Sequence, residues 1–124
     1  MGDARIDRWS RRIVHPRLTL TTSEPALIVR ELEAALRGGG FRTTTTGDGF
    51  SAKQRPWLAW LAAAASTSCV LDVAPTSAAT VVVDVRATGN HPAPTRAAAA
   101  LTHAVRRLAA AGVEVSWGDW EAVA

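Results

Sequence analysis

The sequence predicts an α+β fold: a two-layer sandwich in which two main helices cover one face of a mostly antiparallel sheet of about five or six strands. Two segments have apolar residues at helical spacing, and two others have the pattern of β-hairpins. Single strands begin and end the series. The resulting order is ferredoxin-like, with an inserted hairpin and a short helix, and we expect one domain over residues 17–124.

The first strand and helix are expected between residues 17 and 38. Residues 17–22, RLTLTT, alternate leucine with polar side chains and predict a strand. We expect Ser23 to cap the following helix and Pro25 to lie in its first turn, where a missing N–H group costs nothing. The run Gly38–Gly40 ends this helix. Its inner stripe comprises Leu27, Ile28, Leu32, Ala35 and Leu36.

A hairpin is expected over residues 41–54. Four threonines favour extended backbone because branching at Cβ suits a pleated surface. Gly47-Asp48-Gly49 supplies the positive φ angle that a tight turn needs. A phosphate-binding loop would need a longer glycine pattern with Lys-Ser/Thr and a helix directly after it. Since a strand pattern follows, we interpret the glycines as a turn.

The run Pro56–Ala65 predicts a short helix that begins at its proline, with a buried strand as the alternative. The eighteen residues between Pro56 and Pro75 carry one formal charge, Asp72, and are long enough for a marginal membrane span. Most of them are alanine, serine or threonine, and Asp72 would cost up to about 3 kcal/mol in the bilayer. We therefore expect no membrane span.

A second hairpin is expected over residues 69–88, with its turn at 76–78. Strand alternation assigns five residues to the buried face: Leu71, Val73, Val81, Val83 and Val85. The opposite face then comprises Val70, Asp72, Val82, Asp84 and Arg86. The favoured interpretation of these charges is an Asp–Arg cross-strand pair on a solvated face. The alternative is a pair of carboxylates for acid–base or metal chemistry.

The last helix is expected at Thr95–Ala111, after a loop of glycine, asparagine and prolines. Its expected inner residues are Ala97, Leu101, Ala104, Val105 and Leu108. Its expected outer residues are Arg96, His103, Arg106 and Arg107. A final strand follows at Val113–Trp117, and the remaining residues are expected to form a tail.

The net charge of +3 lies entirely in a basic N-terminal arm, residues 1–16, together with Arg17. Residues 18–124 carry nine cations and nine anions, which argues against a basic groove across the domain. The arm is either a basic anchor for an anionic partner, binding nucleic acid only non-specifically, or a short helix that docks on its own domain. The candidate anchor residues are Arg5, Arg8, Trp9, Arg11 and Arg12.

No specific catalytic motif is present. The three histidines lack metal-ligand spacing, so we expect no metal site, and we expect no cofactor. Cys69 begins an apolar strand, where packing is the usual role of a cysteine. His91 precedes a helix N-terminus, a place where anions often bind, although an exposed loop histidine is the simpler interpretation.

Five tryptophans supply most of the aromatic mass, and at least two are expected to be partly exposed. Trp117 and Trp120 either fold back over the sheet edge or join Trp57 and Trp60 in an interaction surface. Strands of an RNA-binding sheet would carry central aromatic residues, whereas these carry threonine and valine.

The favoured function is therefore a non-enzymatic interaction module that forms a homodimer through the uncovered sheet face and binds a partner protein through a tryptophan-containing surface. The alternative is a small-molecule binding protein or cofactor-free enzyme, whose pocket between the sheet and the short helix would use Trp57, Trp60, His91 and Asp72. One cysteine and no signal peptide favour the cytoplasm. The excess of alanine and of arginine over lysine favours a GC-rich bacterial source.

Overall fold

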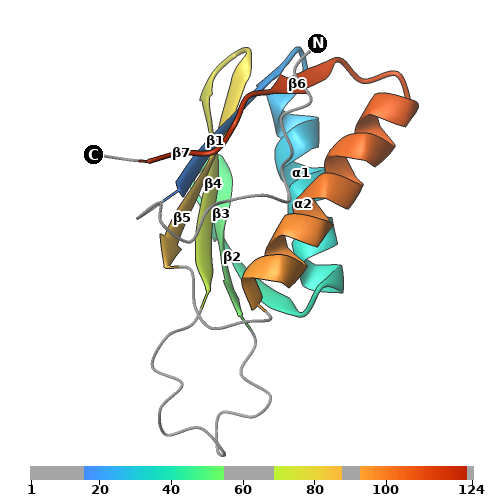
Figure 1. Cartoon of the computed structure of the whole chain (residues 1–124). Helices are drawn as coiled ribbons and strands as arrows, with labels where there is room; N and C mark the ends of the chain where they lie inside the picture. The colour runs from blue at the N-terminus through green and yellow to red at the C-terminus, as the bar shows by residue number, and fades with distance from the viewer. Residues whose placement is uncertain (1–15, 55–68, 88–92, 123–124) are drawn as a thin grey trace, which may run out of the picture.

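A computed structural model describes residues 16–54, 69–87 and 93–122. Two layers are visible in Figure 1, an antiparallel sheet and a pair of helices that covers one of its faces. The elements, in chain order, are β1 (Pro16–Thr22), α1 (Pro25–Gly38), β2 (Phe41–Thr46), β3 (Gly49–Gln54), β4 (Val70–Ser77), β5 (Thr80–Ala87), α2 (Ala93–Ala110), β6 (Val115–Trp117) and β7 (Glu121–Ala122). The predicted α+β two-layer sandwich is confirmed.

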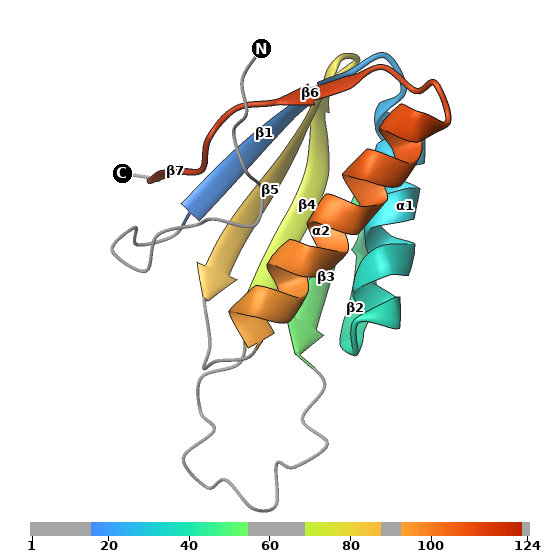
Figure 2. The same ribbon diagram turned by 45° about the vertical axis from the view of Figure 1, so that its right-hand side comes forward.

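The strand order is β2-β3-β4-β5-β1-β6, and β7 also pairs with β1. The four strands between the helices lie side by side in chain order, because β3 of the first hairpin pairs with β4 of the second. This arrangement places β1 beside β5. The ferredoxin-like order predicted from the element sequence is not confirmed. Both helices lie over the same face of the sheet and run in opposite directions (Figure 2).

The hairpin of β2 and β3 turns at Gly47, whose φ angle of 60° lies in the left-handed region. Thr46 then pairs with Gly49, as expected for a two-residue connection. A Cβ atom on Gly49 would collide with the backbone of Val73 and Ala74 in β4. Glycine at this position therefore permits the close approach of β3 to β4.

The start of α1 differs from the expected cap. Its N-cap residue is Glu24, which makes no side-chain capping hydrogen bond, and Ser23 is exposed. The buried hydroxyl of Thr22 takes part instead: it accepts a hydrogen bond from the Glu24 N–H (3.1 Å) and donates one to the Glu114 carbonyl (2.7 Å). The prediction of Ser23 as the cap was wrong. The side chain that bonds the backbone at this turn is that of Thr22, and the same hydroxyl connects the turn to the C-terminal segment.

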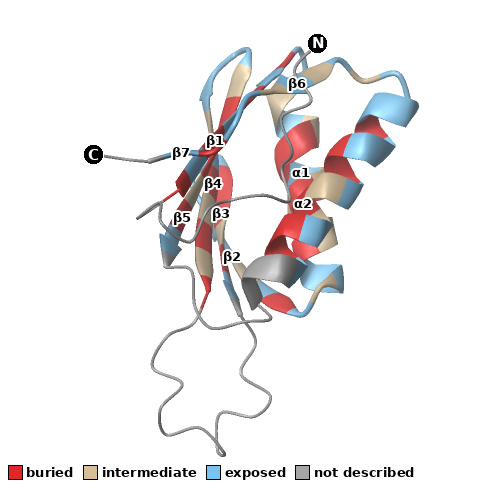
Figure 3. Cartoon of the chain, viewed as in Figure 1, coloured by how far each residue is buried: buried red, intermediate tan, exposed pale blue. Residues whose placement is uncertain are grey.

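The core lies between the sheet and the helices (Figure 3). The inner faces predicted for the second hairpin and for the last helix are confirmed. All the residues predicted for them are buried: Leu71, Val73, Val81, Val83 and Val85 on the hairpin, and Ala97, Leu101, Ala104, Val105 and Leu108 on α2. Of the predicted stripe on α1, Ile28, Leu32 and Leu36 are buried, whereas Leu27 and Ala35 are half-buried. The stripe therefore continues onto the flank of α1 that faces α2.

The final strand predicted at Val113–Trp117 is present as β6, whereas the residues after it, predicted to form a tail, include the strand β7. β6 and β7 both pair with the outer edge of β1, with Trp117 opposite Leu20 and Glu121 opposite Arg17. Trp120 is only 6% exposed and belongs to the core, and Trp117 is half-buried against it. Of the two interpretations of these tryptophans, the structure supports folding back over the sheet edge.

Residues 1–15 of the predicted arm and the whole of the predicted short helix Pro56–Ala65 lie outside the described residues, whereas Pro16, the last residue of the predicted arm, begins β1. In the part of the chain that the structure describes, no helix has the length and apolar character needed to span a bilayer.

Candidate functional site

The sheet face opposite the helices carries a row of polar residues that crosses every long strand. Cross-strand register aligns one residue from each strand in this row. We call this surface the open face. Its row comprises Thr44, Ser51, Asp72, Asp84, Arg17 and Glu121. Two carboxylates thus lie directly opposite each other at the centre of the sheet.

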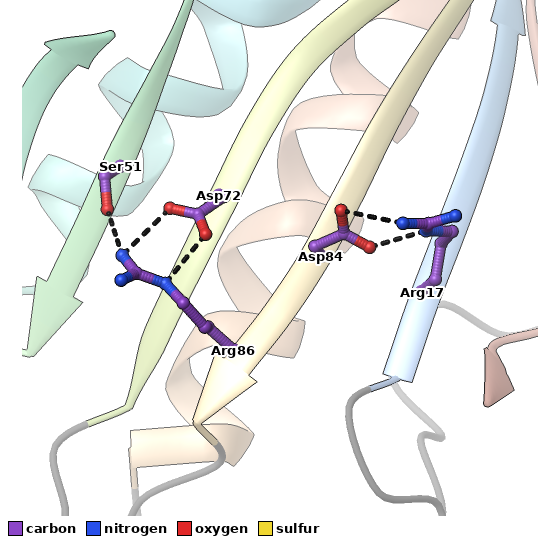
Figure 4. Close-up of polar contacts among 5 residues, drawn as sticks. All are labelled: Arg17, Ser51, Asp72, Asp84 and Arg86. Atoms are coloured by element: carbon purple, nitrogen blue, oxygen red, sulfur yellow. Dashed lines mark hydrogen bonds and ion pairs between the residues drawn. The ribbon is translucent and has the colours of Figure 1, made fainter. Parts of the chain in front are cut away.

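Asp72 is bound by Arg86 from the neighbouring strand. The Arg86 Nε atom lies 2.8 Å from one carboxylate oxygen, and its Nη2 atom lies 3.1 Å from the other. Nη2 also donates a hydrogen bond to the Ser51 hydroxyl at 3.2 Å. The guanidinium group therefore connects β3, β4 and β5 on the open face (Figure 4). The predicted cross-strand Asp–Arg pair is present.

Asp84 is bound in the same way by Arg17 of β1. The Arg17 Nε atom lies 2.6 Å from one oxygen of Asp84, and Nη2 lies 3.2 Å from the other. Figure 4 shows the two side chains extended toward each other across adjacent strands. The hydrogen bond and the negative charge of Asp84 raise the pKa of Arg17 above its ordinary value. Both central carboxylates thus accept a two-pronged arginine contact, the geometry that guanidinium groups favour.

This arrangement favours neutralisation over catalysis. A general base needs a free lone pair directed at a substrate proton, whereas the oxygens of Asp72 and Asp84 already accept hydrogen bonds from arginine. Within the described ranges, no three histidine, cysteine or acidic side chains gather as metal ligands. Cys69 is fully buried, and desolvation raises the pKa of its thiol to about 12. A thiol in such surroundings is a packing residue.

The remainder of the open face is small or β-branched near its centre. Val82 is half-buried there and lies opposite both Thr19 and Ala74, whereas the half-buried Val70 lies at the start of β4, opposite Lys53. Toward the edge of the sheet formed by β2, the open face carries charged side chains. Arg42 of β2 lies directly opposite Lys53 of β3, and both side chains are exposed. Two like charges in one cross-strand pair disfavour desolvation of this end.

The structure separates the residues predicted to form a binding surface. Asp72 lies at the centre of the open face and is half-buried. Trp117 and Trp120 pack on the helix side of the sheet, so they share no surface with Asp72. Trp57, Trp60 and His91 lie outside the described residues, as do the arm residues Arg5, Arg8, Trp9, Arg11 and Arg12.

Sequence analysis missed Arg17 and Ser51 as members of this site. Arg17 was counted with the basic arm, yet it begins a strand and pairs with a residue 67 positions later in the chain. The signal was present in the alternation of residues 17–22, which places Arg17 on the side away from Leu18 and Leu20. The identity of its partner required the register of β1 against β5.

No known protein-family model matches the chain, and no curated protein sequence matches it. The functional argument therefore depends on the geometry described above.

Proposed function

We propose that this chain is a non-enzymatic, cytoplasmic interaction module that forms a homodimer through the open face of its sheet and binds a partner protein elsewhere on its surface. The observation that carries the proposal is the internal neutralisation of Asp72 and Asp84 by Arg86 and Arg17. Removing an unpaired charge from water is costly, and the cost falls when the charge is already paired and hydrogen-bonded.

The side chains of the open face support the same proposal. Sheets that pack face to face interdigitate the side chains of their inner faces. Val70, Val82, Thr19 and Thr21 supply such side chains around the two ion pairs. A second copy offers the same neutralised surface, as a two-fold contact requires. The exposed, like-charged Arg42–Lys53 pair supports a contact over β4, β5 and β1, away from the edge formed by β2.

Sedimentation equilibrium at micromolar concentration tests the proposal. The native chain is expected to sediment as a dimer, and Val82→Arg is expected to sediment as a monomer because it adds an unpaired cation at the centre of the face. Ala109→Arg, on the exposed side of α2, introduces the same residue outside the proposed contact and should remain dimeric. A native chain that sediments as a monomer at micromolar concentration would refute the proposal.

A further inference from the structure

A groove of about 710 Å³ lies between α1 and α2 on the outer side of the helix layer. Its floor is made of small residues from both helices: Ala34, Ala35 and Gly38 on α1, and Ala99, Ala100 and Ala104 on α2. A Cβ atom on Gly38 would have nothing within 4 Å, and a Cβ atom on Gly39 would lie 3.7 Å from Ala100. The floor is therefore close-packed at one point and open beside it.

The α2 wall of the groove is basic, with two arginines and a histidine. Arg96, His103 and Arg107 line it at positions i, i+7 and i+11, which places them on one stripe of the helix over about 16 Å. All three side chains are exposed, and neither arginine forms an ion pair with another described residue. The sequence of α2 contains no acidic residue, and Glu31 of α1 is the acidic side chain among those that line the groove.

We infer that this groove binds an acidic amphipathic helix of a partner protein. Alanine and glycine on the floor allow a third helix to approach closely, since helix separation depends on side-chain size at the contact. In an antiparallel helix, carboxylates at positions i, i+4 and i+11 would lie opposite Arg107, His103 and Arg96, and a carboxylate at i+7 would lie on the same side of that helix. The length of the stripe corresponds to about three helical turns.

This inference rests on the proposed function in one respect: it names the chemistry of the partner protein that the module binds. It uses the helix layer, whereas self-association uses the open face of the sheet. A dimer that fails to bind acidic helices would refute the groove and leave the dimer intact. A Val82→Arg chain that is monomeric and still binds acidic helices would show that binding in the groove does not depend on dimerisation.

The test measures fluorescence anisotropy of labelled synthetic peptides with the full chain. The probe is a 15-residue alanine-based helix with glutamate at positions i, i+4, i+7 and i+11. Comparison peptides carry the same glutamates distributed around the helix, or a central proline that breaks it. Only the first peptide is expected to bind tightly. Equal binding of all three peptides would show charge attraction without recognition of a helix, and no binding at about 1 mM would also overturn the inference.

Two matched pairs of variants locate the contact. Arg107→Glu should weaken binding about tenfold by turning an attraction into a repulsion, whereas Arg106→Glu, an exposed neighbour outside the groove lining, should change it less than about twofold. Ala99→Gln should fill the groove and weaken binding without a change of charge, whereas Ala109→Gln should not. Equal effects of Arg106→Glu and Arg107→Glu would refute a defined groove. Circular dichroism verifies that each variant is folded.

Discussion

Asp72 and Asp84 are direct cross-strand neighbours on β4 and β5, yet each carboxylate is also bound by an arginine: Asp72 by Arg86 of β5 and Asp84 by Arg17 of β1. Like charges in such a pair destabilise a sheet, and opposite charges stabilise it. The repulsion between the two carboxylates is therefore offset by the two Arg–Asp pairs. The two arginines therefore stabilise the pairing of the strands, besides setting the charge of the open face.

Replacing Arg86 by methionine should lower the free energy of unfolding by about 0.5–1 kcal/mol, because Asp72 would then face Asp84 without a partner. The Arg86 side chain is 62% exposed, which limits the effect. Adding Asp72→Asn to Arg86→Met should restore part of the loss. Urea unfolding measures both values, and about 1 M salt should reduce the difference between native and variant. Arg106→Met, which is exposed on α2, should be neutral, and an equal loss there would contradict this account.

Gly49→Ala should destabilise the protein by several kcal/mol or prevent its folding, because the new methyl group would occupy the position of the Val73 carbonyl. Gly38→Ala is the matched control: nothing lies within 4 Å of the added methyl, and this residue ends α1. It should stabilise the chain by about 0.5–1 kcal/mol through reduced entropy of the unfolded state. Thermal unfolding compares the two variants, and an unchanged melting temperature for Gly49→Ala would contradict the close approach of β3 and β4.

Local patterns predicted the inner and outer faces of the second hairpin and of α2 correctly, although the hairpin turns at residues 78–79 and not at 76–78 as predicted. Alternation along β4 and β5 separates the buried valines from Asp72, Asp84 and Arg86, because successive strand residues point to opposite faces. Helical spacing likewise separates Leu101 and Val105 from the arginines of α2. These are properties of neighbouring residues, so a single sequence contains them.

Relationships between distant segments could not be predicted in the same way. The pairing of β1 with β5 brings together Arg17 and Asp84, and nothing local to either residue indicates it. Trp120 follows a glycine and an aspartate, and a local sequence of this kind is typical of a terminus without regular structure. Its burial results from the pairing of β7 with β1. The groove between α1 and α2 also depends on which helix flanks meet.

Trp120→Ala should cost about 3–5 kcal/mol, as expected for removal of a large aromatic side chain from a core, since Trp120 is only 6% exposed. Trp117→Ala should cost less, because its side chain is half-buried at the margin of the core. Chemical unfolding followed by circular dichroism measures both variants without relying on tryptophan fluorescence. A larger loss for Trp117→Ala would show that the C-terminal segment is held chiefly by β6.

The stability of the protein should fall with pH in alkaline solution because of Cys69. Burial raises the pKa of this thiol from about 9 to about 12 in the folded chain. Below pH 9, both the folded and the unfolded chain keep the proton, so stability does not depend on this group. Between pH 9 and 12, only the unfolded chain loses it, and the free energy of unfolding should decrease by about 1.4 kcal/mol per pH unit.

Few other side chains titrate between pH 9 and 12, because the chain has no tyrosine and a single lysine. A change of stability in this range can therefore be assigned to Cys69. Cys69→Ala is the control: it removes the ionisable group, so its free energy of unfolding should decrease far less steeply between pH 9 and 12. A thiol reagent should modify the native chain only as fast as the chain unfolds, since the side chain is fully buried. An equal pH slope in the alanine variant, or rapid modification of the folded chain, would contradict the burial of this thiol beneath the sheet.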